Sequence, residues 1–111
     1  MHYLLFYDLA ADYAERRPQY RIAHLELLEQ CVERGELVLA GALAEPMDGA
    51  VFLFQGEGPR AAEAFAEADP YVQNGLVKSW RVRKWPTVVG ANAATPVSSA
   101  SLREAAGITS R

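Results

Sequence analysis

The residue types best suited to chemistry lie on one face of a predicted helix over residues 17–34. At about 100° per residue, His24 shares its direction with Arg17 and Arg21, which lie nearer the N-terminus. The same face continues with apolar residues that predict a buried stripe, namely Leu25, Leu28, Cys31 and Val32. Burying cationic groups without partners costs several kcal/mol. The cationic end of this face therefore either stays in water at the edge of the core or lines a cavity, and a cavity would make this a ligand-binding or catalytic protein.

His24 and Asp69 are the candidates for proton transfer. An imidazole exchanges its proton readily near neutral pH, so His24 is suited to act as a general base or acid. Asp69 ends a second predicted helix and is followed by Pro70 and Tyr71, and its carboxylate would orient His24 by accepting a ring N–H. A packed core histidine and a turn-forming aspartate are the alternatives, because the spacing along the chain does not show whether the two side chains meet.

Arginine and aromatic residues are candidates for binding a substrate. Arg17 and Arg21 would clamp an anionic group through pairs of hydrogen bonds, or would instead form ion pairs with nearby acidic residues. Aromatic side chains would line a pocket, although core or interface packing explains most of them: Tyr3, Tyr7, Tyr71, Trp80 and Trp85. The predicted site therefore combines the catalytic residues His24 and Asp69 with four substrate-binding residues: Arg21, Arg17, Tyr7 and Tyr71.

The elements that must position these residues follow two periodicities. Strand patterns cover residues 2–8, 36–43, 50–55 and 76–85, and helical patterns cover 17–34 and 60–68. Pro18 is expected in the first turn of the longer helix, and Gly35 just after its end. This strand-helix-strand-strand-helix-strand order predicts an α+β, ferredoxin-like fold with a four-stranded antiparallel sheet.

The composition of the chain changes near residue 88. Residues 1–88 carry all of these elements and form the predicted domain, whereas residues 89–111 are rich in small and polar side chains. The tail has little to bury, so it is expected to be flexible or to dock on a partner, with a short helical segment at 102–106.

Three of the predicted strands are apolar on both faces, which indicates that both faces of the sheet are covered. In the first strand the two faces are Leu4 and Phe6 against Tyr3, Leu5 and Tyr7. In the third strand they are Val51 and Leu53 against Phe52 and Phe54. Strict alternation in the second strand places Leu37 and Leu39 on the same face. Two helices cover only one side of the sheet, so a homodimer through the open sheet face is expected, and a small-molecule ligand would fit a cavity at such an interface.

The bulk properties argue against several function classes. The chain has 111 residues, a net charge of −3 and one cysteine, so it fits one domain without an internal disulfide, and its acidic balance argues against nucleic acid as a partner. No stretch approaches the ~18 apolar residues of a membrane span, and no secretory signal is recognisable, so a soluble, cytoplasmic protein without a membrane partner is expected. Two distant histidines and one cysteine do not make a metal site, and no glycine-rich phosphate loop is recognisable, so no metal and no cofactor is predicted.

Four short segments carry a family resemblance: Arg21-Ile22-Ala23-His24-Leu25, Leu39-Ala40-Gly41, Ala68-Asp69-Pro70-Tyr71 and Asn74-Gly75-Leu76. Together they resemble the YCII-related (YciI-like) family over about residues 3–88. The resemblance implies a ferredoxin-like fold that pairs into a dimeric α+β barrel, and a His–Asp dyad at His24 and Asp69 with Arg21 beside it. The family often has proline where this chain has Ile22 and Ala42, and these departures leave the ligand open.

The resemblance also carries expectations about activity. A relative of this family is a dehydrochlorinase that acts on a chlorinated hydroxyhydroquinone, and muconolactone isomerase has a similar fold. They imply cofactor-independent proton transfer on a small oxygen-rich or cyclic substrate, as in an isomerase or a lyase that eliminates HX. A non-catalytic dimeric module that binds a small ligand is the alternative. A third interpretation is an RNA-recognition surface on Phe52 and Phe54, which the acidic net charge opposes.

Overall fold

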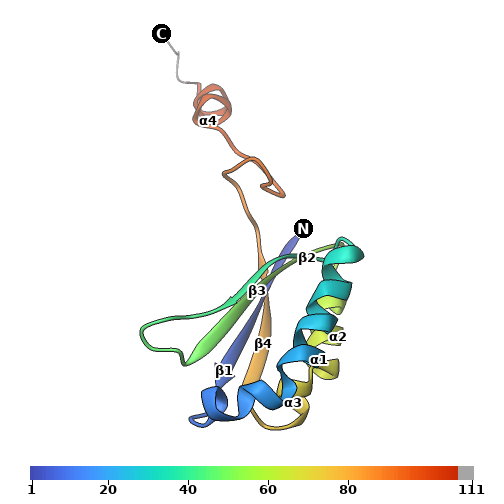
Figure 1. The fold of residues 1–111 in the computed structure, drawn as a ribbon. Helices are drawn as coiled ribbons and strands as arrows, with labels where there is room; N and C mark the ends of the chain where they lie inside the picture. Colours follow the sequence, from blue (N-terminus) through green and yellow to red (C-terminus); the bar gives the residue numbers. More distant parts are fainter. Residues whose placement is uncertain (108–111) are drawn as a thin grey trace.

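A computed structural model describes residues 1–107 of the chain, and Figure 1 shows their arrangement. The strands are β1 (His2–Leu9), β2 (Leu37–Ala42), β3 (Gly49–Gln55) and β4 (Val77–Trp85). The helices are α1 (Tyr13–Glu33), α2 (Arg60–Ala68), α3 (Pro70–Gln73) and α4 (Ser99–Ala105). Every predicted strand and helix is present, with ends that differ by a few residues.

The four strands form one antiparallel sheet in the order β2-β3-β1-β4. Figure 1 shows α1, α2 and α3 on the same side of this sheet. This arrangement confirms the predicted α+β, ferredoxin-like fold. β4 lies at an edge of the sheet, where its charged side chains protect it against pairing with other chains.

The core lies between the sheet and the three helices. Alternate residues of β1 face it, among them Leu5 and Tyr7. β3 contributes Phe52 and Phe54, which are 2% and 1% exposed. Because these two rings are buried in the core, they are not available to stack on bases, and the RNA-recognition interpretation built on them is wrong.

β2 departs from strict alternation near its start. Its pairing with β3 shifts so that Leu37 lies opposite Phe54 and Leu39 lies opposite Leu53. An extra residue of this kind is a β-bulge, and here it sends the two leucines to opposite faces of the sheet. Leu37 is therefore 7% exposed in the core, whereas Leu39 is 71% exposed on the open face. The prediction that they share a face was wrong. It assumed strict alternation along the strand, and an inserted residue shifts every later side chain to the other face.

α1 begins one turn earlier than predicted, at Tyr13, and contains Pro18 in its interior. Asp12 precedes the helix, and its carbonyl accepts the N–H of Arg16, so the hydrogen-bond ladder starts before the proline. A proline in a helix removes the N–H that would bond four residues back. The preference of proline for the first turn of a helix therefore predicted a start that lies too late in the chain.

The buried face of α1 is turned relative to the predicted stripe. His24 and Cys31 are buried as expected, but Leu25 and Val32 are 40% and 56% exposed. Each of these two exposed residues follows a buried one and is therefore turned about 100° from it. The inclusion of Leu25 and Val32 in the stripe was wrong for this reason.

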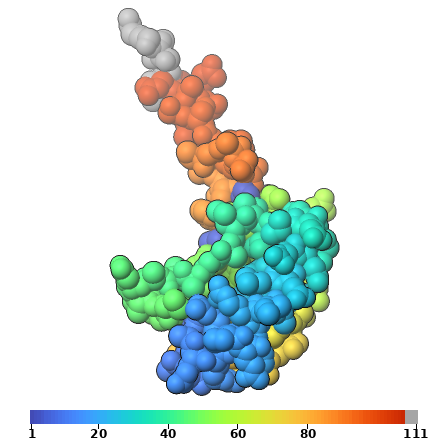
Figure 2. Space-filling view, viewed as in Figure 1, coloured from blue at the N-terminus to red at the C-terminus, as the bar shows by residue number. Residues whose placement is uncertain are grey.

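The segment after β4 projects away from the sheet, as Figure 1 and the space-filling view in Figure 2 show. α4 begins at Ser99, three residues before the predicted 102–106 segment, because the Ser98 hydroxyl caps the helix by accepting the N–H of Ser101. α4 has no buried residue. Residues 108–111 of the predicted tail lie outside the described residues.

None of the helices within residues 1–107 is long and apolar enough to cross a membrane.

Candidate active site

His24 and Asp69 meet in the interior of the protein. α1 carries His24, and Asp69 lies at the junction of α2 and α3. The distance between His24 Nδ1 and Asp69 Oδ1 is 2.8 Å. Asp69 has no exposed surface, and His24 is 8% exposed. The structure thus brings together the two residues that were predicted to act as a pair, although 45 positions separate them in the sequence.

The proline after Asp69 explains why the carboxylate lies at this junction. A residue before proline disfavours the helical backbone, and Asp69 adopts an extended conformation (φ −68°, ψ 122°) that ends α2. Pro70 then begins α3, where its missing N–H costs no hydrogen bond. Asp69 is the N-cap of α3, and its Oδ1 accepts the backbone N–H of Tyr71 at 3.0 Å. The short helix α3 itself was not predicted.

Tyr7 provides a further hydrogen bond to the same carboxylate. Its hydroxyl donates to Asp69 Oδ2 at 2.6 Å. Burial, with the neighbouring Asp69, raises the pKa of Tyr7, so the hydroxyl keeps its hydrogen at neutral pH. We predicted Tyr7 as a substrate-binding residue, but its 3% exposed side chain lies in the core and contacts Asp69 instead. The sequence gives only a weak signal for this positioning role. A buried phenol hydroxyl needs a hydrogen-bond partner, but the sequence does not show which residue that partner is.

These contacts determine which nitrogen of His24 is available for chemistry. A carboxylate that already accepts hydrogen bonds from Tyr7 and Tyr71 offers lone pairs to the imidazole, so we assign the ring hydrogen to Nδ1. Nε2 is then the unprotonated nitrogen of the neutral ring. Fixing the tautomer in this way is what an aspartate does for a catalytic histidine.

Aromatic rings also hold the imidazole. The Tyr71 ring stacks on His24 with a centroid distance of 3.8 Å and an interplanar angle of 11°. Phe65 and Phe52 approach it at steeper angles, with centroids at 6.0 Å and 6.5 Å. Packing and hydrogen bonds therefore fix the same orientation, as the positioning of a reactive group requires.

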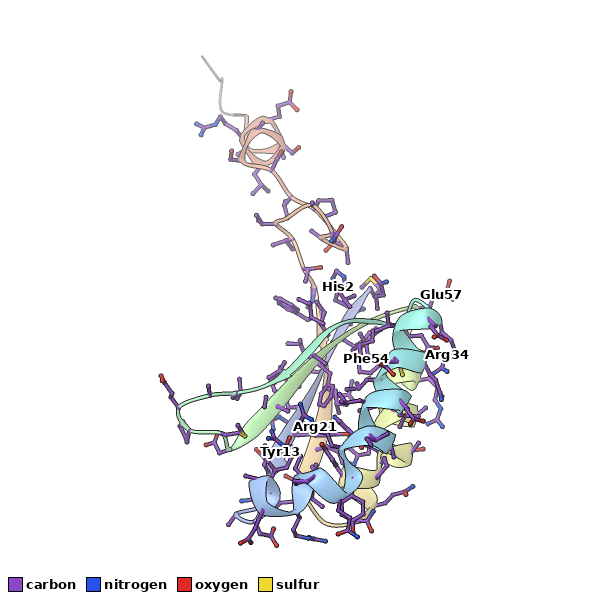
Figure 3. All side chains as sticks on the ribbon, in the orientation of Figure 1. His2, Tyr13, Arg21, Arg34, Phe54 and Glu57 are labelled. Atoms are coloured by element: carbon purple, nitrogen blue, oxygen red, sulfur yellow. The ribbon has the colours of Figure 1, made fainter. Side chains whose placement is uncertain are left out.

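A cavity of about 220 Å³ opens beside the imidazole. Its lining comes from α1, α3, β2 and β3: Arg17, Arg21, His24, Leu25, Leu28, Ala40, Gly41, Ala42, Ala50, Phe52 and Tyr71. Figure 3 labels Arg21 on the side of α1 that faces the sheet. The predicted residues Arg17, Arg21 and Tyr71 thus lie at one cavity with His24. Trp85, by contrast, lies on the open face of the sheet.

The two arginines at the cavity are not paired with acidic side chains of the described residues. Neither Arg17 nor Arg21 forms an ion pair within residues 1–107, whereas Arg16 lies 3.8 Å from Asp12. The Arg17 guanidinium lies 5.7 Å from the centre of the Tyr13 ring, which helps to hold it in place. The described residues therefore favour an anion clamp over the alternative of ion pairs. In this same part of the chain, no cluster of three or more His, Cys, Asp or Glu side chains could hold a metal ion.

Comparison with known families decides the affiliation of the chain. The YCII-related domain matches residues 1–86. The chain belongs to the YCII-related domain family. Protein YciI of Escherichia coli O6:H1 (strain CFT073) is 31% identical over 97 residues, which cover 79% of this chain and 99% of that protein. Protein YciI of Shigella flexneri matches this YCII-related chain with the same values.

Two solved structures share the fold of this YCII-related domain. One is the 5-chloro-2-hydroxyhydroquinone dehydrochlorinase TftG of Burkholderia phenoliruptrix AC1100, in complex with 2,5-dihydroxybenzoquinone. The match has a TM-score of 0.65 and 21% identity, and it covers 78% of this chain and 95% of the dehydrochlorinase chain. Protein Atu4242 of Agrobacterium tumefaciens has a TM-score of 0.51 and 16% identity, and covers 85% of this chain and 98% of its own. At these identities the likeness establishes the fold.

We expect Tyr7→Phe to lower the free energy of unfolding by about 1.5–3 kcal/mol, because it removes a hydrogen bond to a buried carboxylate. Tyr3→Phe is the matched control. Tyr3 lies on the same face of β1, and its hydroxyl makes only a 3.5 Å contact with the Glu57 carbonyl, so its loss should cost less than about 1 kcal/mol. Urea unfolding measures both values, and equal losses would contradict the role of Tyr7.

Proposed function

We propose that this YCII-related protein is a cofactor-independent enzyme that moves a proton within a small oxygen-rich or cyclic substrate. The observation that carries the proposal is the buried His24–Asp69 hydrogen bond at the wall of a cavity that also contains Arg17 and Arg21. A histidine oriented by a carboxylate and open to a cavity has the arrangement expected of a general base.

In the proposed reaction, Nε2 of His24 takes a proton from a C–H or O–H group of the substrate. Asp69 keeps the hydrogen on Nδ1 and balances the positive charge that forms on the ring. Arg21, together with Arg17, stabilises the negative charge left on the substrate. Return of the proton to another atom completes an isomerisation. Departure of a neighbouring halide with its bonding electron pair completes an elimination of HX.

The dehydrochlorinase of the same fold supports this substrate class. Its name gives 5-chloro-2-hydroxyhydroquinone as its substrate, and its structure holds 2,5-dihydroxybenzoquinone. Both compounds are single oxygen-rich rings. The cavity of about 220 Å³ in the present chain is small for a binding pocket and suits a ligand of that size.

We expect His24→Gln to lower kcat/KM at least about 100-fold, because it removes general base catalysis. Chlorinated hydroxyquinols and small cyclic lactones form the first substrate panel. The absorbance of the ring and the release of chloride report the reaction. His2→Gln is the matched control with rates near those of wild type, since His2 contacts Thr87 and lies outside the cavity lining. Equal rates in His24→Gln and wild type, or saturable binding without turnover, would favour the non-catalytic ligand-binding module.

We also propose that the protein forms a homodimer through the open face of the sheet. Leu39 and Trp85 are 71% and 45% exposed there, and with Val51 and Leu53 they border a shallow apolar hollow. Exposed apolar patches of this kind mark interaction surfaces, and a two-fold axis lets one copy cover the other. The tail from residue 89 starts beside this face and would dock on the second copy.

We expect Leu39→Lys to convert the dimer to a monomer, because it would place an unpaired charge in an apolar interface. Ile22→Lys is the matched control, since Ile22 is also a large apolar side chain, 74% exposed on α1, and α1 covers the opposite face of the sheet. Size-exclusion chromatography with light scattering gives the mass of each variant. A dimeric Leu39→Lys, or a monomeric wild type, would rule out this interface.

A further inference from the structure

Two buried polar atoms of residues that line the cavity have no hydrogen-bond partner in the part of the chain that the structure describes. They are the hydroxyl of Tyr71 and Nε of Arg17. Tyr71 is 2% exposed, and both residues line the cavity beside His24. Buried polar groups nearly always have partners, so an exception needs an explanation. The neighbouring Asp69 shows the contrast, because both of its oxygens accept hydrogen bonds.

The two atoms offer the same chemistry to a ligand. Nε of Arg17 carries a hydrogen and acts only as a donor. Burial, with the neighbouring Tyr13, raises the pKa of the Tyr71 hydroxyl to about 12, and the charges of Arg21 and Arg17 oppose this rise. The hydroxyl therefore keeps its hydrogen at neutral pH and can donate it. Two donors backed by two guanidinium charges fit an oxygen that carries negative charge.

We infer that Tyr71 and Arg17 form an oxyanion subsite, and that the substrate class is a single-ring compound with an enolisable carbonyl whose oxygen occupies this subsite. The inference rests on the proposed function, because it uses His24 as the base. A cavity of about 220 Å³ has room for one ring beside the two donors. Tyr71 is then a catalytic residue that contacts the substrate oxygen.

The chemical step at this subsite balances without a co-reactant. His24 Nε2 takes the proton from the carbon next to the carbonyl, and the electron pair of that C–H bond becomes a C=C bond. The carbonyl π pair moves onto its oxygen, which accepts hydrogen bonds from Tyr71 and Arg17 as its charge develops. If a ring C=C bond lies next to that carbon, the carbonyl re-forms, the double bond shifts by one position, and the imidazolium returns the proton to the far carbon of the original C=C bond. If the next carbon carries a halide instead, the carbonyl re-forms, the enolate C=C pair makes a new C=C bond to that carbon, the halide leaves with its bonding pair, and the imidazolium passes the proton to water.

Tyr71→Phe removes the hydroxyl and keeps the contacts that position the ring. The Tyr71 ring stacks on His24, and its backbone N–H bonds to Asp69, and phenylalanine preserves both contacts. Tyr3→Phe is the matched control. It also removes a phenol hydroxyl from a buried tyrosine, but the Tyr3 hydroxyl contacts the Glu57 carbonyl, and Tyr3 is not part of the cavity lining.

The test measures binding of two probes of similar shape by calorimetry at mildly alkaline pH. 4-Nitrophenolate mimics the charged oxygen of an enolate, whereas 4-nitroanisole carries no charge. We expect Tyr71→Phe to weaken phenolate binding about tenfold or more, the effect of losing a hydrogen bond to a charged acceptor, and to leave anisole binding unchanged. Arg17→Lys, which keeps the charge but lacks the Nε hydrogen, should show the same selective loss. Tyr3→Phe should bind both probes as wild type does.

Three results would overturn the subsite. They are an unchanged phenolate affinity in both Tyr71→Phe and Arg17→Lys, an equal loss for both probes in Tyr71→Phe, and a wild type that does not bind the phenolate. Binding is measured without turnover, so the proposed function fails separately. A wild type that is inactive on every substrate but shows Tyr71-dependent phenolate binding would contradict the proposed enzyme activity and support the subsite.

Discussion

One buried carboxylate determines how the parts of this protein meet. Asp69 has no exposed surface, and a charge in such a place is tolerated only when hydrogen bonds replace water. Its donors come from separate elements: the Tyr7 hydroxyl from β1, the His24 imidazole from α1 and the Tyr71 N–H from α3. The central strand, the long helix and the α2–α3 junction must therefore come together at this point. The same contacts that satisfy the carboxylate fix the tautomer of His24, so the stability of the core and the orientation of the proposed base have a common origin.

α1 divides its inward face between packing and chemistry. Toward its C-terminal end, Cys31 is 1% exposed and belongs to the hydrophobic core. Nearer its N-terminal end, Arg17 and Arg21 border the cavity, and no acidic side chain within residues 1–107 pairs with them. A helix that served only to pack would gain from apolar residues there. The cationic residues at the cavity are instead what an anionic ligand or a developing negative charge requires.

The sequence predicted the fold better than it predicted the contacts of the site. The strands, the two longer helices of the domain and hence the α+β topology follow from local repeats of two and of 3.6 residues. The types of His24 and Asp69, with the family resemblance, identified the pair. Their contact depends on how α1 packs against the α2–α3 junction, which no local pattern contains. The role of Tyr7 was missed for the same reason, since its partner lies 62 positions away. The bulge in β2 was missed because the prediction assumed strict alternation of side chains along the strand, without an inserted residue.

The tautomer of His24 tests the candidate site most directly. Nitrogen NMR of the neutral imidazole distinguishes a hydrogen on Nδ1 from one on Nε2, and His2→Gln assigns the signals of the two histidines. The hydrogen bond to Asp69 predicts that His24 carries its hydrogen on Nδ1 in the wild type and loses this preference in Asp69→Ala, which has no side-chain acceptor. A wild-type His24 with its hydrogen on Nε2 would leave no free base at the cavity and would contradict the proposed proton transfer.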